Sequence, residues 1–263
     1  MSDLIASAYA TLERWYALGH DVRPHAHARF VHDARLPLVY DANFAAGVRA
    51  ESTAEIDAVL AQADALYAGC GHRQVLWDPA TPPALEARLL LEGYALEHEV
   101  VLVLEGALAA RGPALELRGV ETAADWQVFT ELCRLDHEEE ARKGFHEPWP
   151  HAVTEQIAAS KRAKSPAVRY QLARVDGVDC AFFSGWPGEN GVGKVEDLFT
   201  RAEFRGRGIG SALIAACVDD ARSRGAGPVL IGALSDDTPK HMYAALGFRP
   251  LCVQRQYLLS ASV

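Results

Sequence analysis

Two arginines and three glycines are gathered in residues 205–211, which read Arg-Gly-Arg-Gly-Ile-Gly-Ser. They follow a short apolar strand predicted over residues 195–200 and precede a helix with apolar residues at Leu213, Ile214 and Val218. The first N–H groups of a helix have no partner inside the helix, and glycines let a backbone approach a ligand closely. Arg205 and Arg207 add positive charge that suits a pyrophosphate. The stretch therefore predicts an anion-binding turn at a helix N-terminus.

Two common phosphate-binding motifs do not fit this turn. No Lys-Ser or Lys-Thr pair follows the glycines, so the turn is not a nucleoside-triphosphate loop. The glycines are spaced G-x-G-x-G, whereas a dinucleotide-binding turn needs G-x-G-x-x-G.

The spacing resembles the acyl-CoA pyrophosphate loop of the GNAT N-acetyltransferase superfamily, R-x-x-G-x-G, with Arg205, Gly208 and Gly210 at its fixed places. Residues 236–248 resemble the closing segment of that family, N-x-x-A-x-x-x-Y-x-x-x-G-F. The sequence departs from this segment at Asp236, where Asn is usual, and at Pro239, where Ala is usual. The resemblance covers about residues 115–259 and implies that this region binds acetyl-CoA, which is consumed as a cosubstrate.

The resemblance also implies which residues contact the cosubstrate. Backbone groups of the strand end are expected along the pantetheine arm, and a bulge in this strand would free an amide for the thioester oxygen. The expected cofactor-binding residues are Leu198, Phe199, Thr200, Arg205, Gly206, Arg207, Gly208, Ile209, Gly210, Ser211 and Asp236.

Acetyl transfer to an amine needs a base for the amine and benefits from an acid for the leaving thiolate. Tyr243 stands where the family places its thiolate acid, and the alternative is an aromatic residue packed on an amphipathic helix. Glu196 is the expected base, acting directly or through water; Asp197 and a strand-edge role for Glu196 remain open. The acidic run at residues 136–140 is either a rim that attracts an amine or a solvated helix face.

Composition limits the remaining possibilities. The net charge of −9 argues against nucleic acid or an anionic membrane as a partner, and no apolar run reaches the length of a membrane span. Five scattered cysteines without a C-x-x-C pair, and an N-terminus without a basic stretch, predict a cytoplasmic protein with reduced thiols. His25, His27 and His32 lack further ligands, so no metal site is expected. A monomer or a homodimer fits these features.

The chain divides into two predicted domains, residues 1–109 and 110–263, with the best linker candidate at 105–114. Capping boxes predict helices starting after Ser52 and Thr122, and residues 38–40 resemble a short strand. In both halves a helix ends at Gly, an aromatic residue follows and a long strand closes the unit, at Gly93-Tyr94 and at Gly247-Phe248. The N-terminal half therefore resembles a degenerate GNAT repeat, although any helix-to-strand unit could end in this way.

The resulting prediction is an α+β protein with a mixed, mostly antiparallel sheet flanked by helices, arranged as two GNAT-like units. The expected activity is that of an acyl-CoA-dependent N-acetyltransferase. It would move the acetyl group to an amine of a small molecule or peptide by direct attack in a ternary complex. The alternatives are a non-catalytic acyl-CoA-binding sensor or scaffold and an acyltransferase that uses a longer acyl chain.

Overall fold

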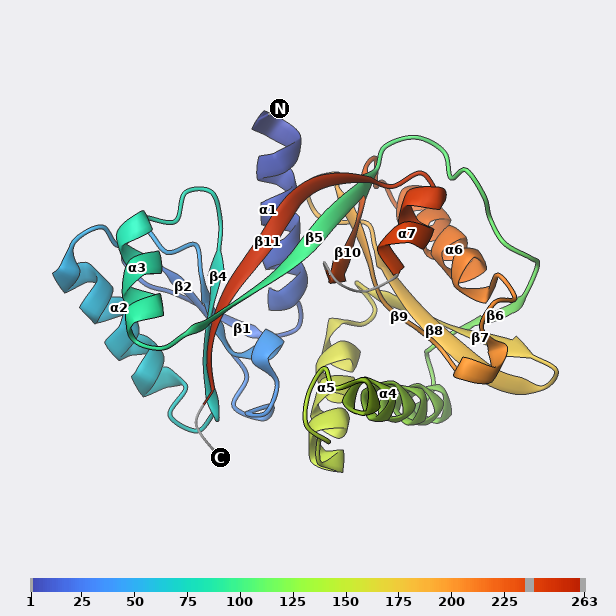
Figure 1. The fold of residues 1–263 in the computed structure, drawn as a ribbon, viewed down its shortest axis with the longest axis horizontal. Helices are drawn as coiled ribbons and strands as arrows, with labels where there is room; N and C mark the ends of the chain where they lie inside the picture. Colours follow the sequence, from blue (N-terminus) through green and yellow to red (C-terminus); the bar gives the residue numbers. More distant parts are fainter. Residues whose placement is uncertain (1, 235–238, 261–263) are drawn as a thin grey trace. The chain divides into compact units, whose positions relative to one another are not determined.

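The computed structural model describes residues 2–234 and 239–260. Its helices are α1 Ser2–Ala17, α2 Thr53–Leu66, α3 Pro83–Leu91, α4 Ala123–Lys143, α5 His151–Lys164, α6 Ile209–Ser223 and α7 Pro239–Ala245 (Figure 1). Its strands are β1 Asp21–Pro24, β2 Arg29–His32, β3 Phe44–Ala46, β4 His72–Trp77, β5 Ala95–Leu104, β6 Glu116–Gly119, β7 Arg169–Val175, β8 Val178–Trp186, β9 Gly193–Thr200, β10 Val229–Leu234 and β11 Arg249–Ser260.

The chain folds into two compact units, each made of separate stretches of sequence. The first unit comprises Met1–Thr11 and Val100–Cys252, and the second comprises Leu12–Glu99 and Val253–Val263. This division differs from the predicted boundary after residue 109, because β5 and β11 each contribute residues to both units. The assignment of residues 1–109 as a degenerate repeat remains a proposal.

Each unit contains a mixed sheet. The strand order is β11-β5-β10-β9-β8-β7-β6 in the first unit and β1-β2-β3-β4-β11-β5 in the second. Antiparallel pairing predominates in both units, with parallel pairs at β9–β10 and β3–β4. The predicted α+β class with mixed, mostly antiparallel sheets is therefore confirmed.

Helices α4 and α6 cover opposite faces of the sheet in the first unit. Successive residues of a strand point to opposite faces, and β8 carries Phe182 and Phe183 in succession. Phe182 packs on Phe129 of α4 with ring centroids 4.7 Å apart, whereas Phe183 lies in the core cluster that contains Leu213 of α6. The two aromatic residues thus fix which helix lies on which face.

Local sequence signals account for the helix starts. Ser52 and Thr122 both form complete capping boxes, in which the hydroxyl accepts from the backbone N–H three residues later, at 3.3 Å from Glu55 and 3.2 Å from Asp125.

The predicted strand at residues 38–40 is wrong, because Tyr40 begins a short 3-10 turn that ends at Ala42. The strands of this region are instead β2 and β3, which pair in an antiparallel ladder.

Residues 105–114 are not a free linker. The backbone N–H of Ala109 donates to the Leu246 carbonyl at 3.0 Å, and the Arg222 guanidinium of α6 donates to the Gly106 carbonyl at 2.8 Å. A side chain at Gly112 would meet the Gly208 carbonyl oxygen at 2.6 Å, so this glycine allows the segment to lie against the start of α6. The segment is part of the first unit.

Candidate active site

Strand β9 is interrupted by a bulge. Phe199 pairs with Phe182 of β8 and Glu196 pairs with Ser184, so Asp197 and Leu198 together face the single residue Phe183. Asp197 adopts φ +67°, a left-handed conformation that accompanies the extra residue. The bulge implied by the family resemblance is thus present. It interrupts the ladder at Asp197 and Leu198, and Phe199 and Thr200 then pair with β8 again.

Strand β9 pairs with its other neighbour, β10, only near its start. Gly193 and Lys194 lie opposite Val229 and Leu230 in this parallel pair. Both strands continue beyond these positions, to Thr200 and Leu234. The backbone groups near the bulge are therefore available to a ligand lying along the strand.

The turn after β9 leads into the N-terminus of α6. Gly206 and Gly208 adopt φ values of +73° and +76°, which glycine reaches without steric cost. Gly208 is the N-cap of α6 and has no side chain to bond the first N–H groups of the helix. These N–H groups and the positive end of the helix dipole favour an anion at this point.

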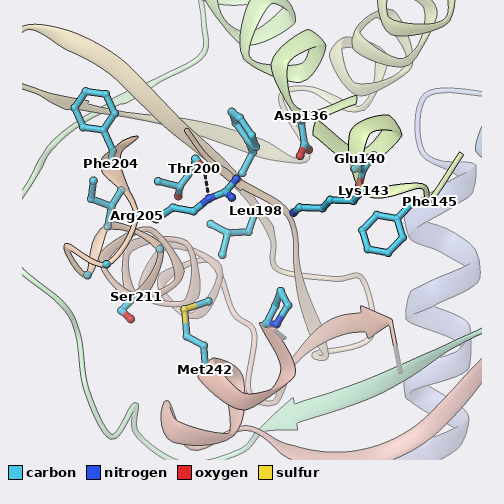
Figure 2. Close-up of a pocket in the computed structure, with 16 residues that line it drawn as sticks. Asp136, Glu140, Lys143, Phe145, Leu198, Thr200, Phe204, Arg205, Ser211 and Met242 are labelled. Carbon is cyan, nitrogen blue, oxygen red and sulfur yellow. Dashed lines mark hydrogen bonds between the residues drawn. The ribbon is translucent and has the colours of Figure 1, made fainter. Parts of the chain in front are cut away.

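A cavity of about 500 Å³ joins the bulge to this helix start (Figure 2). Its lining comes from α4, from the end of β9, from the turn and first residues of α6, and from α7. The lining residues are Asp136, Glu140, Lys143, Phe145, Leu198, Phe199, Thr200, Phe204, Arg205, Gly206, Gly208, Ile209, Gly210, Ser211, Pro239 and Met242. The cavity thus brings together every predicted cofactor-binding residue other than Arg207 and Asp236.

Asp236 lies outside the described residues. Arg207 is described but does not line the cavity: its guanidinium lies 5.2 Å from the Phe204 ring centroid and donates to the Glu203 carbonyl at 3.3 Å. The sequence predicted that the charge of Arg207 would favour a pyrophosphate, but in this structure its guanidinium lies at Phe204 and Glu203, outside the cavity lining.

Arg205 lines the cavity, but its guanidinium is engaged by protein groups. It donates to both carboxylate oxygens of Glu139 at 2.6 and 2.7 Å. It also donates to the Thr200 carbonyl at 2.8 Å (Figure 2). Arg205 and Lys143 together lower the pKa of Glu139 to about 2. Arg205 thus ties α4 to the turn, a role that the sequence motif did not reveal.

The two predicted catalytic residues lie outside the cavity lining. Glu196 forms an ion pair with the buried Lys194, its neighbour on the same face of β9. Tyr243 is 5% exposed in the core and packs against Phe248 with ring centroids 6.3 Å apart. The next residue toward the N-terminus, Met242, does line the cavity.

Asp197, the alternative base, contacts helix α5 and does not line the cavity. It pairs with Lys161 of α5, and this charge together with the hydrogen bond lowers the pKa of Asp197 against the opposing effect of burial. The pairing links α5 to the bulge and leaves Asp197 ionised.

The sequence left one wall of the cavity undecided. Asp136, Glu140 and Lys143 lie at i, i+4 and i+7 on α4, so all three belong to one helix face. Their side chains extend from α4 toward the cavity (Figure 2). Of the two interpretations of residues 136–140, the structure favours the rim for Asp136 and Glu140, and the helical spacing was the signal available for it.

Burial changes the acidity of this wall. It raises the pKa of Asp136 to about 8, with Glu140 adding repulsion and Lys161 opposing it. Burial also raises the pKa of Glu140, which lies 3.5 Å from the imidazole of His146. The wall can therefore exchange protons near neutral pH.

Two further properties concern the described residues only. In residues 2–234 and 239–260, no helix is long and apolar enough to cross a bilayer. The same residues contain no group of three or more His, Cys, Asp or Glu side chains placed to hold a metal ion.

Comparison with known proteins finds a family match within the first unit. Residues 131–248 match the family described as Acetyltransferase (GNAT) family. Among curated proteins none matches the sequence significantly.

Several solved structures share the architecture over nearly the whole chain. A GCN5-related N-acetyltransferase from Kribbella flavida has 18% identity and a TM-score of 0.67, covering 99% of this chain and 95% of that chain. A functionally unknown conserved protein from Staphylococcus epidermidis has 12% identity and a TM-score of 0.68, with 93% and 95% coverage. A tandem GNAT protein from the clavulanic acid biosynthesis pathway has 16% identity and a TM-score of 0.57, with 99% and 94% coverage. At these identities the likeness shows the fold alone, and it confirms the predicted GNAT fold with two units.

Proposed function

Residues 131–248 match the acetyltransferase (GNAT) family, and on this premise we propose that the first unit transfers an acetyl group from acetyl-CoA to an amine. The observation that carries the proposal is the cavity that joins the β9 bulge to the N-terminus of α6. Its volume of about 500 Å³ lies within the range of small-molecule sites.

The chemistry of the lining fits an acyl-CoA. The first N–H groups of α6 can donate to a pyrophosphate, and Gly206 and Gly208, which have positive φ and no side chain, let it approach the backbone closely. The end of β9, from Leu198 to Thr200, suits the amide-rich pantetheine arm. When bound, acetyl-CoA would supply the activated acyl group as a thioester.

The residues of this chain would then bind, orient and move protons. The bulge at Asp197 and Leu198 exposes backbone that can donate to the thioester oxygen as that oxygen gains charge. Tyr243 remains the proposed acid for the leaving thiolate: it does not line the cavity itself, but it directly follows Met242, which does. Glu196 can serve as a base only by releasing Lys194, which weakens that proposal.

A second function has one observation in its favour. Neither Glu196 nor Tyr243 lines the cavity, so the chain could bind an acyl-CoA without acting on it. Such a sensor or scaffold would keep the turn at residues 206–211 and show no transfer.

Two measurements separate these functions. Calorimetric titration with acetyl-CoA, and with a longer acyl-CoA for comparison, reports binding and acyl preference. A panel of amines mixed with acetyl-CoA, followed by the release of free thiol, reports transfer. Binding with amine-dependent thiol release supports the transferase; binding without release by any amine supports the sensor; absence of binding refutes both.

The proposal also covers the cellular compartment and the oligomeric state of the protein. All five cysteines are free thiols in this structure and four of them are buried, which suits a reducing compartment such as the cytoplasm. A monomer or a homodimer is proposed, and sedimentation of the purified chain would distinguish them.

A further inference from the structure

Asp136 of α4 is a carboxylate of the cavity wall that the family motifs do not assign. Its side chain points from α4 into the cavity, across from Leu198 and Thr200 at the end of β9 (Figure 2). It therefore faces the part of the cavity that begins at the bulge, where the thioester of the proposed substrate would lie.

Asp136 differs from the carboxylates around it. Four neighbouring carboxylates each pair with a basic side chain: Glu139 with Arg205, Glu140 with His146, Glu196 with Lys194 and Asp197 with Lys161. The Asp136 carboxylate makes no hydrogen bond or ion pair with another side chain in residues 2–234 and 239–260. A proton or an ammonium group from a ligand can reach it without displacing an existing partner.

The groups that face Asp136 keep it ready to exchange a proton. They are Glu139 and Glu140 on its own helix, Lys161 from α5 and Asp197 from β9. Burial, the two glutamates and Asp197 favour the protonated form, Lys161 favours the charged form, and the resulting pKa is about 8. Proton transfer is most efficient when the pKa of the base lies near the working pH.

We propose that Asp136 is the general base that accepts a proton from the ammonium form of the acceptor. The acceptor is therefore a basic amine that enters the cavity in its protonated form. This inference rests on the proposed transferase function, because it assigns the base of that reaction.

The step conserves protons and electrons. The ammonium transfers one proton to the Asp136 carboxylate and becomes a neutral amine. The nitrogen lone pair then forms a bond to the thioester carbon, and the C–S bond breaks with its electron pair on sulfur. The nitrogen loses its second proton, the thiolate gains one, and Asp136 returns its proton to solvent.

The test compares two acceptors of different basicity. Propylamine is almost entirely protonated at pH 7 and needs a base, whereas hydroxylamine is largely neutral and does not. In single-turnover measurements with bound acetyl-CoA, Asp136→Asn should slow propylamine acetylation by about 100-fold or more. After subtraction of the uncatalysed reaction of hydroxylamine with the thioester, the same variant should change the hydroxylamine rate by less than about threefold, a contrast that a merely structural role of Asp136 would not produce.

Controls keep the outcomes distinct. Glu131→Gln alters an exposed carboxylate of the same helix outside the cavity and should leave both rates unchanged. Acetyl-CoA affinity by calorimetry should be equal in the wild type and Asp136→Asn. Equal loss of rate with both amines, or no loss with propylamine, overturns the role of Asp136, whereas no transfer by the wild-type chain overturns the proposed function itself.

The wild-type chain provides a test that does not depend on the variant folding. Its propylamine rate should rise with pH through an apparent pKa near 8, as Asp136 loses its proton. Its hydroxylamine rate should lack this rise. A propylamine profile that rises only near the pKa of the free amine would overturn the assignment.

Discussion

Ser211 offers a direct test of the anion site at α6. It is the third residue after the Gly208 N-cap, it lines the cavity, and the first turn of α6 contains no acidic residue. Gly208 is a poorer choice, because a side chain there would meet Pro113 at 2.8 Å and would also be strained at φ +76°. Ser211→Asp adds one negative charge without either problem.

The substitution should act in opposite directions on folding and on binding. A carboxylate in the first turn of a helix stabilises the fold by about 0.3–1 kcal/mol through the helix dipole. The same carboxylate repels a phosphate; a pair of unit charges about 4 Å apart interacts by about 1 kcal/mol in water and about 4 kcal/mol near a protein surface. Because Ser211 is half-buried, we expect a loss of about 1–3 kcal/mol in binding, or about 5- to 150-fold in acetyl-CoA affinity.

Calorimetry and thermal unfolding measure the two effects separately. Ser211→Asn is the matched control, since it has nearly the shape of Asp and no charge, and it should bind acetyl-CoA within about threefold of the wild type. The difference between Asp and Asn should shrink at high salt, because salt screens the repulsion. If Ser211→Asp unfolds no earlier than the control and binds acetyl-CoA equally well, the pyrophosphate does not lie at α6.

Three further outcomes are expected. Tyr243→Phe should reduce the single-turnover rate by about 100-fold if the hydroxyl protonates the thiolate, and an unchanged rate would leave Tyr243 with a packing role. Titration should give one acetyl-CoA per chain, because residues 12–99 contain no R-x-x-G-x-G turn, and two equivalent sites would contradict this. Thr122→Ala should lower the free energy of unfolding by about 1 kcal/mol by removing the hydroxyl of the capping box, whereas Thr122→Ser, measured by the same denaturant titration, should restore most of it.

The sequence by itself determined the features that depend on neighbours within a few residues. The capping boxes at Ser52 and Thr122 need only a hydroxyl and an acidic residue three positions later. The turn before α6 needs glycines at Gly206 and Gly208, where φ is positive. The motif positions around this turn therefore predicted most of the cavity lining.

Only the tertiary structure decided which charged groups meet. The sequence predicted Glu196 as a base, but in the structure Glu196 is paired with Lys194. Asp197 is the next residue along the chain, yet at the bulge its carboxylate pairs with Lys161 of α5. One extra residue in a strand changes which side chains share a face. The family resemblance predicted a bulge in this strand, but not which residues it would occupy or where their side chains would pair.

The acidity of Asp136 is likewise a product of long-range contacts. Its position on α4 follows from the helical spacing, but its burial and its exposure to Lys161 and Asp197 depend on where α5 and β9 pack. Desolvation and nearby charges fix a pKa, and both are set by residues distant in the chain. The sequence could thus place the carboxylate on a helix face, and only the folded chain gave it a cavity to line and a pKa suited to a base.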